Sequence, residues 1–458
     1  MNWAGPDDPE NPHNWPVWQR TYHAIIPSLF CFAITFGTSV MTPAVPALVS
    51  EFNVSRTTAL VSLTLYTIGL VFGPIFSAPL SEQHGRKIVY IVTAPIFVIF
   101  VLGTGFSSSI AALLVCRFLA GLVGSPVLAI AGGTCADLFE PKVRALATNG
   151  FIMAAFLGPC LGPFCGGFVV QYAGWRWTQW LIVFITIPIF VLFLFTKETY
   201  KPQILHRRAR KRGAESPKPN RSFVTTMAQN SIRPVRMLAT EPVVFFLSIY
   251  TGFNFAVMYC FFAAFPYVFS LEPYLFSTSE IGLTFLSVSL GVVLASITIV
   301  VFDRTIYQKK HNQAVQDGAK NAPPEHRLYS ALLGSIGLPI GLFWFGWTAH
   351  YGFYWVIPVI GGIPFAWGNL CLFGSSLLYM GDVYGAENGA SALAANGIIR
   401  YIFGGIFPLV TVQMYQGLGI GWSNSLLGFI AVILLPTPWV LFRYGTAIRK
   451  RSQLPVSI

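Results

Sequence analysis

The side chains able to carry charge are few, and their positions limit the chemistry open to this chain. Asp, Glu, Lys and Arg make up 10% of the 458 residues. Two arginines, Arg117 and Arg400, lie inside long apolar runs, whereas the 17 carboxylates lie between such runs or at their ends. A guanidinium in hydrocarbon costs at least about 2.5 kcal/mol on insertion scales, so each arginine is expected to face a partner or a wet cavity. A cavity of this kind favours a neutral or anionic ligand over a polycation.

Enzyme chemistry is not indicated. The sequence has no phosphate-binding loop of the P-loop form and no G-x-S-x-G elbow, and its apolar runs hold neither His nor paired carboxylates. We therefore expect neither an enzyme nor a user of ATP, and no cofactor. The cysteines lack zinc-ligand or redox spacing, so we expect small packing residues and no metal. They are Cys31, Cys116, Cys135, Cys160, Cys165, Cys260 and Cys371.

Composition places these residues in a membrane. The chain is 54% hydrophobic and 15% aromatic, far from a soluble protein with roughly 25% charged residues. A helix crosses the hydrocarbon layer with about 20 apolar residues. Such runs occur at 24–48, 58–80, 88–106, 110–133, 149–171, 177–196, 242–269, 281–301, 329–348, 353–379, 389–414 and 421–442. The sequence therefore predicts an all-α membrane protein with twelve transmembrane helices.

The basic residues predict the topology. If both termini face the cytosol, 25 of the 29 Lys and Arg lie in cytosolic segments, and two, Arg56 and Arg176, lie in outer loops. This asymmetry orients membrane proteins, and it accounts for the basic excess without a nucleic-acid partner. The basic run 206–212 is either a solvated loop or a contact for anionic lipid heads.

The chain divides into two halves of six spans. The divisions are a cytosolic tail (1–23), a first bundle (24–196), a cytosolic loop (197–241), a second bundle (242–442) and a second tail (443–458). The pattern D-[LV]-[FY]-x5-A-x-A follows span four at Asp137 and span ten at Asp382. This echo favours two pseudo-symmetric six-helix bundles of the secondary-transporter kind.

Span five carries the most specific pattern. Small residues recur at every fourth position: Gly150, Ala154, Gly158, Gly162 and Gly166. This spacing makes one flat stripe on a helix, against which another helix packs closely. Two prolines, Pro159 and Pro163, loosen the backbone beside the stripe. The stripe is either ordinary tight packing or a moving interface.

Several motifs together resemble a known family. Gly158-Pro159, Gly162-Pro163 and Gly166-Gly167 resemble the antiporter motif in span five of drug:proton antiporters of the major facilitator superfamily. The stretches that begin at Pro79 and at Arg117 are similar to that family's loop between spans two and three and its span-four motif. Further strings resemble the fungal twelve-span branch that exports drugs, polyamines and secondary metabolites. They are ENPHNW (10–15), GWRWTQW (174–180), KETYKP (197–202), RPVRMLATEP (233–242) and LPIGLFWFGWT (338–348).

The resemblance implies the major facilitator fold, with the span-five stripe between the two halves. It also implies that Glu82, Gly85, Arg86 and Lys87 form a cytosolic gate that pairs with the other half; otherwise the basic pair only sets topology. Ala78, Glu82 and Gln83 depart from the family's loop motif, and Gln83 removes one basic residue.

The same resemblance implies roles for the buried charges. For Arg117 it implies proton tuning or substrate contact, against a structural role of bonding to backbone carbonyls at a helix break. Arg400 has the same two interpretations. Glu82 and Asp137 are the candidates for proton coupling, and Asp382 is the counterpart of Asp137 in the second half.

Polar and aromatic residues in mid-span are the candidates for substrate contact. They are Tyr250, Asn254 and Tyr259 in span seven, Trp367 and Asn369 in span ten, and Asn396 and Arg400 in span eleven. The alternative is that they only pack against lipid or neighbouring helices.

We expect a proton-linked exporter of small amphipathic, neutral or anionic molecules. It is expected to be a monomer in the plasma membrane, with the vacuolar membrane as the alternative. A nutrient facilitator or importer and a non-transporting receptor or scaffold remain the other hypotheses. Gradient-driven, gradient-independent or absent flux separates the three.

Overall fold

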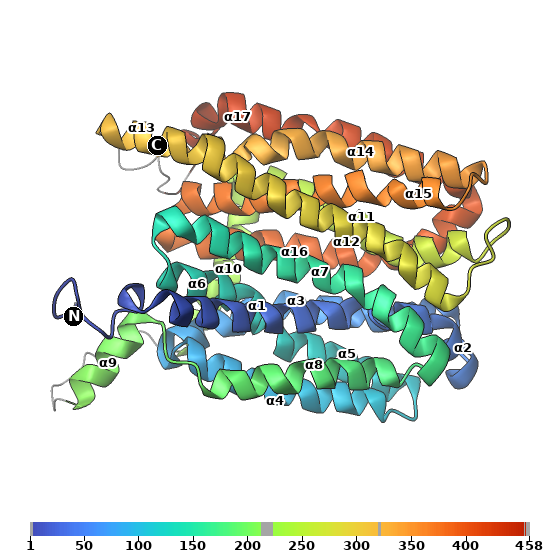
Figure 1. The fold of residues 1–458 in the computed structure, drawn as a ribbon, viewed down its shortest axis with the longest axis horizontal. Coiled ribbons are helices and arrows are strands. Elements are labelled where there is room, and N and C mark those ends of the chain that lie inside the picture. Colours follow the sequence, from blue (N-terminus) through green and yellow to red (C-terminus); the bar gives the residue numbers. More distant parts are fainter. Residues whose placement is uncertain (1–2, 212–222, 319–321, 453, 455–458) are drawn as a thin grey trace.

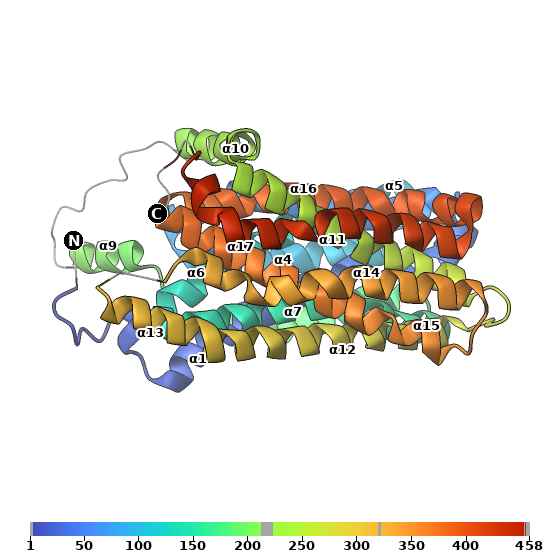
Figure 2. The same cartoon turned by 90° about the horizontal axis from the view of Figure 1, so that it is seen from above.

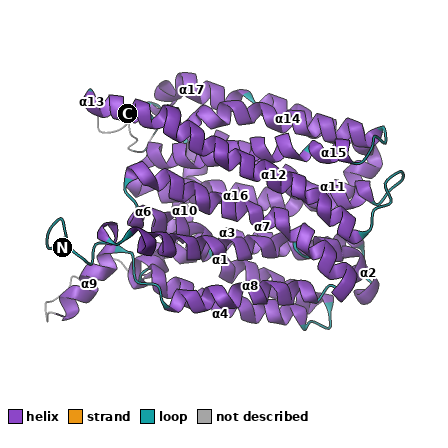
Figure 3. Ribbon diagram, in the orientation of Figure 1, coloured by secondary structure: helices purple, strands orange, loops and turns teal. Residues whose placement is uncertain are grey.

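The structure is helical throughout the part that it describes. The computed structural model describes residues 3–211, 223–318, 322–452 and 454, and within these ranges it has no strand (Figure 3). The first half contributes α1 (Val17–Ser39), α2 (Val45–Phe52), α3 (Arg56–His84), α4 (Arg86–Gly105), α5 (Ile110–Gly124), α6 (Pro126–Leu138), α7 (Pro141–Ala173) and α8 (Trp177–Leu194). The central loop contributes α9 (Lys201–Lys211) and α10 (Phe223–Thr240).

The second half contributes α11 (Pro242–Phe269), α12 (Thr278–Phe302), α13 (Gln308–Gln316), α14 (Tyr329–His350), α15 (Val356–Ile360), α16 (Gly362–Leu434) and α17 (Pro436–Arg449). Short helical turns are η1 (Pro12–Asn14), η2 (Thr42–Ala44), η3 (Asp303–Tyr307) and η4 (Pro324–Leu328).

The long helices lie side by side with roughly parallel axes (Figures 1 and 2). In Figure 1, most helices of the first half, in blue to green, lie below those of the second half, in yellow to red. The end of the bundle where α1 begins and α17 ends is called the terminal end, and the opposite end, beside α2, is called the distal end.

The helices long and apolar enough to cross a membrane match the predicted spans. Eleven such segments occur in the described residues, and the last, Asn388–Arg449, has 62 residues. A crossing takes about 20 residues, so this segment is long enough for two. The backbone leaves helical geometry inside it at Gly419, where φ is 79°. Counted as two crossings, it gives the twelve predicted spans.

Prolines and glycines set the breaks between these helices. The fourth span bends where α5 ends at Gly124 and α6 begins at Pro126, because proline fits the first turn of a helix and lacks the N–H that would continue the previous one. A single residue, Gly85, separates α3 from α4 with φ of 92° and ψ of 166°. Only glycine adopts this conformation readily. A β-carbon there would also lie 2.2 Å from an oxygen of Glu198.

The segment before α1 folds back onto the central loop. Asp8 accepts two hydrogen bonds of 2.7 Å from the guanidinium of Arg208 on α9, and Glu10 accepts one of 2.6 Å. These bonds hold the pKa of Asp8 well below its usual value. The ammonium of Lys197 lies 5.9 Å from the ring centre of Trp15. The strings ENPHNW and KETYKP, far apart in sequence, therefore meet at the terminal end.

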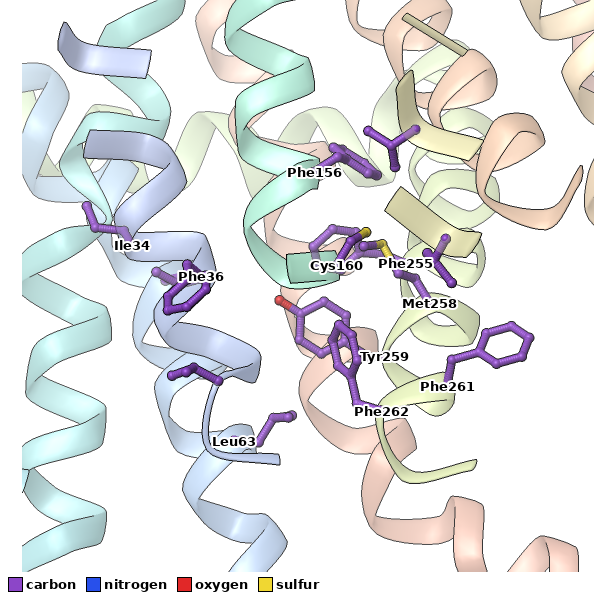
Figure 4. Close-up of a cluster of buried hydrophobic side chains, with 14 of the residues drawn as sticks. Ile34, Phe36, Leu63, Phe156, Cys160, Phe255, Met258, Tyr259, Phe261 and Phe262 are labelled. Carbon is purple, nitrogen blue, oxygen red and sulfur yellow. The ribbon is translucent and has the colours of Figure 1, made fainter. Parts of the chain in front are cut away.

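The largest buried cluster spans both halves. Phe156 and Cys160 of α7 lie beside Phe255 and Tyr259 of α11, with the Tyr259 hydroxyl pointing toward the helices of the first half (Figure 4). The ring centres of Phe156 and Phe255 are 6.1 Å apart. Aromatic packing therefore joins the two halves in the middle of the molecule.

Candidate functional site

Arg400 occupies a ring of aromatic side chains deep in the bundle. Its guanidinium carbon lies 4.5 Å from the ring centre of Phe373, 4.7 Å from that of Tyr401 and 5.1 Å from that of Phe255. These four residues are called the Arg400 box. Phe156 of α7 closes the box from the first half, 4.9 Å from Phe373 between ring centres.

The bonding of Arg400 suits a ligand site. The side chain is half-buried, and its buried Nε has no hydrogen-bond partner. Within the described residues it forms no ion pair, and the three aromatic rings around it stabilise its charge through cation–π contacts.

Arg117 instead has the geometry expected for a structural role, bonded to backbone carbonyls at the end of a helix. It is fully buried and donates hydrogen bonds to the backbone carbonyls of Gly37 at 2.8 Å, Thr38 at 3.3 Å and Ser62 at 3.4 Å. The guanidinium carbon lies 4.2 Å from the ring centre of Tyr66. Because α1 ends at Ser39, the carbonyls of its last turn lack helical partners. The Arg117 guanidinium supplies hydrogen-bond donors to these carbonyls and also to Ser62 of α3, and so links α1 to α3.

Two of the span-seven candidates keep unpartnered polar atoms. The hydroxyl of Tyr250 and both side-chain polar atoms of Asn254 are buried without a hydrogen bond. Burying such atoms unpaired is costly, which fits a site completed by water or ligand. Tyr259 is buried at the Arg400 box, with its ring centre 4.8 Å from that of Phe255.

The remaining candidates are engaged inside the second half. The Asn369 amide donates to the backbone carbonyl of Asn254 at 2.9 Å, and the Asn396 amide donates to Thr251 at 2.5 Å. The indole of Trp367 donates to Thr298 at 3.0 Å. These bonds join α11, α12 and α16. In this structure these three side chains therefore hold helices of the second half together.

A charge cluster joins the helices of the first half at the terminal end. Arg86 pairs with Asp137 at 2.5 Å, and a carboxylate oxygen of Glu198 accepts the Arg86 amide at 2.9 Å. The Lys87 ammonium donates to the carbonyl of Leu194 at 3.2 Å. Among the described residues, the gate contact expected between Arg86 or Lys87 and the other half is not made, because both charges are satisfied within their own half. The Glu82 side chain lies outside the described residues.

The second half repeats this arrangement. Arg327 pairs with Asp382 at 2.8 Å and with Asp303 at 3.0 Å. In each half an arginine just before the third span meets the aspartate that ends the fourth. The echo between Asp137 and Asp382 thus has a structural counterpart. Sequence reasoning missed Arg327 and Glu198, although Arg327 precedes span nine as Arg86 precedes span three.

Three glycines of the α7 stripe pack inside the first half. A β-carbon on Gly158 would lie 2.7 Å from the Phe36 nitrogen, one on Gly162 3.0 Å from the Val40 nitrogen, and one on Gly166 2.2 Å from the Val40 carbonyl oxygen. All these atoms belong to α1 or to the turn after it. The Pro159 carbonyl accepts a hydrogen bond from Ser39 at 2.8 Å. The expectation that the stripe lies between the halves is corrected for these three glycines, which allow α1 and α7 to approach closely. Gly167 of the same motif does face the second half, because a β-carbon there would lie 2.7 Å from the Thr278 carbonyl oxygen of α12.

A different face of α7 contacts the second half. A β-carbon on Gly282 of α12 would lie 2.9 Å from the Pro163 carbonyl oxygen. The Asn149 amide donates to the Ser296 hydroxyl at 2.7 Å. Asn149 and Gly282 were not predicted from sequence, because neither stands in a pattern that distinguishes one helix face from another.

A second contact between the halves joins α3 and α16. The Thr64 hydroxyl donates to the Gly405 carbonyl at 2.7 Å, and the Gln413 amide donates to Thr57 at 3.3 Å. The molecule therefore has a central cationic box flanked by two long contacts between its halves.

Comparison with known proteins identifies the family. Residues 28–408 match the family model described as Major Facilitator Superfamily. The chain belongs to this superfamily. It is 39% identical to MFS-type transporter traF of Penicillium crustosum, over 99% of this chain and 93% of that protein. It is 38% identical to Efflux pump FUBT of Fusarium oxysporum, over 98% of this chain and 76% of that protein.

One further sequence relative and one solved structure are also similar to this chain. The chain is 35% identical to Polyamine transporter 4 of Saccharomyces cerevisiae, over 99% of this chain and 73% of that protein. The solved structure of the proton:xylose symporter XylE matches with a TM-score of 0.66 and 15% identity, over 94% of this chain and 96% of the symporter. The resemblance stated from sequence is confirmed, as is the twelve-span fold. This major facilitator protein crosses the membrane repeatedly, and neither its family nor its fold is that of an enzyme.

Proposed function

We propose that this protein is a secondary active exporter of small amphipathic organic molecules, neutral or anionic. The observation that carries the proposal is the Arg400 box, a half-buried cation within an apolar segment that has aromatic neighbours and no ion pair in the described residues. The names of relatives, Efflux pump FUBT among them, support the direction of transport.

The charge balance favours an anion over a polyamine, although one relative is named as a polyamine transporter. A polycation brought to Arg400 meets a like charge at low dielectric, which is strongly unfavourable. Three carboxylates at the terminal end are already engaged. Asp137 pairs with Arg86, Asp382 pairs with Arg327, and Glu241 accepts the hydroxyl of Tyr384. An organic anion gains an ion pair at Arg400, and its apolar part packs on the aromatic rings.

Transport is proposed to occur by alternating access. The bundles 24–196 and 242–442 rock about the contacts of α7 with α12 and of α3 with α16, and expose the Arg400 box to each side in turn. The terminal end faces the cytosol, because it carries most of the Lys and Arg. Each inside-negative 100 mV then drives a monoanion outward with about 2.3 kcal/mol.

Proton coupling is proposed to act through Asp137. Protonation of this carboxyl removes its ion pair with Arg86 and so loosens the terminal end of the first half. We propose that the transporter works as a monomer in the plasma membrane, with the vacuolar membrane as the alternative. Its partners are a small-molecule substrate, protons and the lipid bilayer, with no part for nucleic acid.

Reconstitution tests this function. Proteoliposomes with an imposed pH gradient or potential are given a panel of organic anions, neutral amphiphiles and polyamines, and mass spectrometry identifies what accumulates. We expect gradient-driven accumulation of anionic or neutral members, lost in Arg400→Gln and partly kept in Arg400→Lys for the anions. Uptake of polyamines alone would refute the charge argument. Gradient-independent flux would indicate a facilitator, and absence of any flux would indicate a receptor or scaffold.

A further inference from the structure

A cavity at the distal end lies apart from the Arg400 box. It has a volume of about 410 Å³, within the range of roughly 300–1,000 Å³ typical of small-molecule sites. Residues of both halves line it: η2, α2, α3 and α7 contribute from the first half, and α11 and α12 from the second. Its lining is mostly Pro, Val, Leu, Ile and Phe, which suits an apolar or aromatic molecule.

Two polar groups in this lining differ in their exposure. Thr42 is 5% exposed, and its buried hydroxyl has no hydrogen bond within the described part of the chain. Arg56 is exposed, is the one charged residue in the lining and forms no ion pair in the described residues. The other arginine of the predicted outer loops, Arg176, pairs with Glu51 at 2.6 Å. A buried hydroxyl without a partner, together with an exposed arginine in the lining of the same apolar cavity, suits an amphipathic ligand.

The helix that begins at the cavity strengthens the preference for an anion. Arg56 is the first residue of α3, a helix of 29 residues whose N-terminus carries partial positive charge. The helix α12 also begins at the cavity, with Thr278, but its N-terminus already has the carboxylate of Glu280. No carboxylate among the described residues lines the cavity to offset the positive charge of Arg56.

We propose that this distal cavity binds a small aromatic organic monoanion, with its charge at Arg56 and a polar group at the Thr42 hydroxyl. The binding stands on the cavity itself. That it holds the exported anion before release rests on the proposed function, which makes the distal end the outer face. Because Pro163 of the first half and Gly282 of the second both line it, a ligand here bridges the halves and stabilises this arrangement. External anion is therefore expected to inhibit export.

Cysteine protection tests the site without requiring transport. Val49, a half-buried lining residue, is replaced by cysteine. The rate at which a membrane-impermeant maleimide labels this cysteine is measured after subtracting the labelling of the parent chain. The probe is 2-naphthalenesulfonate, and the matched neutral probe is 2-naphthalenesulfonamide. We expect the sulfonate to slow labelling at least tenfold more effectively than the sulfonamide. Arg56→Gln should remove this protection, and Arg56→Lys should retain most of it.

Control variants decide where the probe acts. Arg176→Gln removes the other outer arginine and should leave protection unchanged, as should Arg400→Gln. Equal protection by the two probes, or protection that survives Arg56→Gln, would overturn the proposal. Protection that disappears in Arg400→Gln would assign the probe to the central box and also overturn it. Protection by the sulfonate in a protein that moves no solute would support the distal site while contradicting the export function.

Discussion

Replacing Gly158 by alanine tests whether the α7 stripe packs against α1 or lies at a moving interface. The new β-carbon would lie 2.2 Å from the Thr35 hydroxyl oxygen and 2.7 Å from the Phe36 nitrogen. Such overpacking typically costs about 1–3 kcal/mol. Alanine also gains up to about 1 kcal/mol over glycine inside a helix, which obscures a single measurement.

A matched variant removes this second effect. Gly150 belongs to the same stripe and the same helix, but a β-carbon there meets nothing within 4 Å. Gly150→Ala therefore has the gain in helix propensity and no clash. The difference in unfolding free energy between the two variants isolates the clash, and we expect Gly158→Ala to be less stable by about 1–3 kcal/mol.

The assay compares purified variants by thermal or denaturant unfolding, together with flux per folded molecule in proteoliposomes. A contact within the first half predicts lower stability with flux per folded molecule nearly unchanged. Equal stability of the two variants, or unchanged stability with lost flux in Gly158→Ala, would refute the assignment of the stripe to α1.

Three further predictions concern other contacts. Asp137→Asn should destabilise the protein by about 3–5 kcal/mol because it leaves the Arg86 charge buried and unpaired. In a double-mutant cycle measured by thermal unfolding, the double variant with Arg86→Gln should recover much of the lost stability. Additive losses of stability would contradict the pairing. Gly282→Ala places a carbon 2.9 Å from a carbonyl oxygen of α7, so flux should fall severalfold, and unchanged flux would argue against a working α7–α12 contact. The pKa of Asp8 is lowered, so its carboxylate stabilises docking of the segment before α1 fully at pH values above 3.8, the ordinary pKa of aspartate. This stabilisation is lost as the pH falls from there through the lowered pKa. Hydrogen exchange of residues 3–15, corrected for intrinsic rates, should therefore rise on acidification below about pH 4. In Asp8→Asn this segment should be undocked already at pH 7. An unchanged exchange rate in Asp8→Asn would show that the pair with Arg208 does not hold the segment.

The sequence was sufficient for the span count and for the internal repeat. Apolar length is a local property, so a run of about 20 residues can be recognised without knowing its neighbours. The Asp137 and Asp382 echo was also visible, because the two halves keep the same local order of residues. Glu198 could not be found in this way, since it bonds to the backbone of α4, and backbone groups leave no mark on the sequence.

The face of a helix that meets each neighbour was less accessible. Gly158 and Gly282 both read as small residues in apolar helices, yet one packs inside a half and the other packs between halves. The choice between structural and functional roles of Arg117 likewise depended on the end of α1, which is set by tertiary packing. Arg400 was found as a candidate because charge in a membrane is rare, but its aromatic box is assembled from separate parts of the chain.

The bare charge of Arg400 implies that voltage acts differently on the empty and the loaded carrier. An unoccupied binding centre that shifts relative to the membrane field carries a positive charge with it. Once an anion is seated, the same shift is nearly electrically silent. Rapid solution exchange on a planar bilayer should thus reveal a transient current from the empty protein that saturating ligand suppresses, and Arg400→Gln should remove that current from the empty protein.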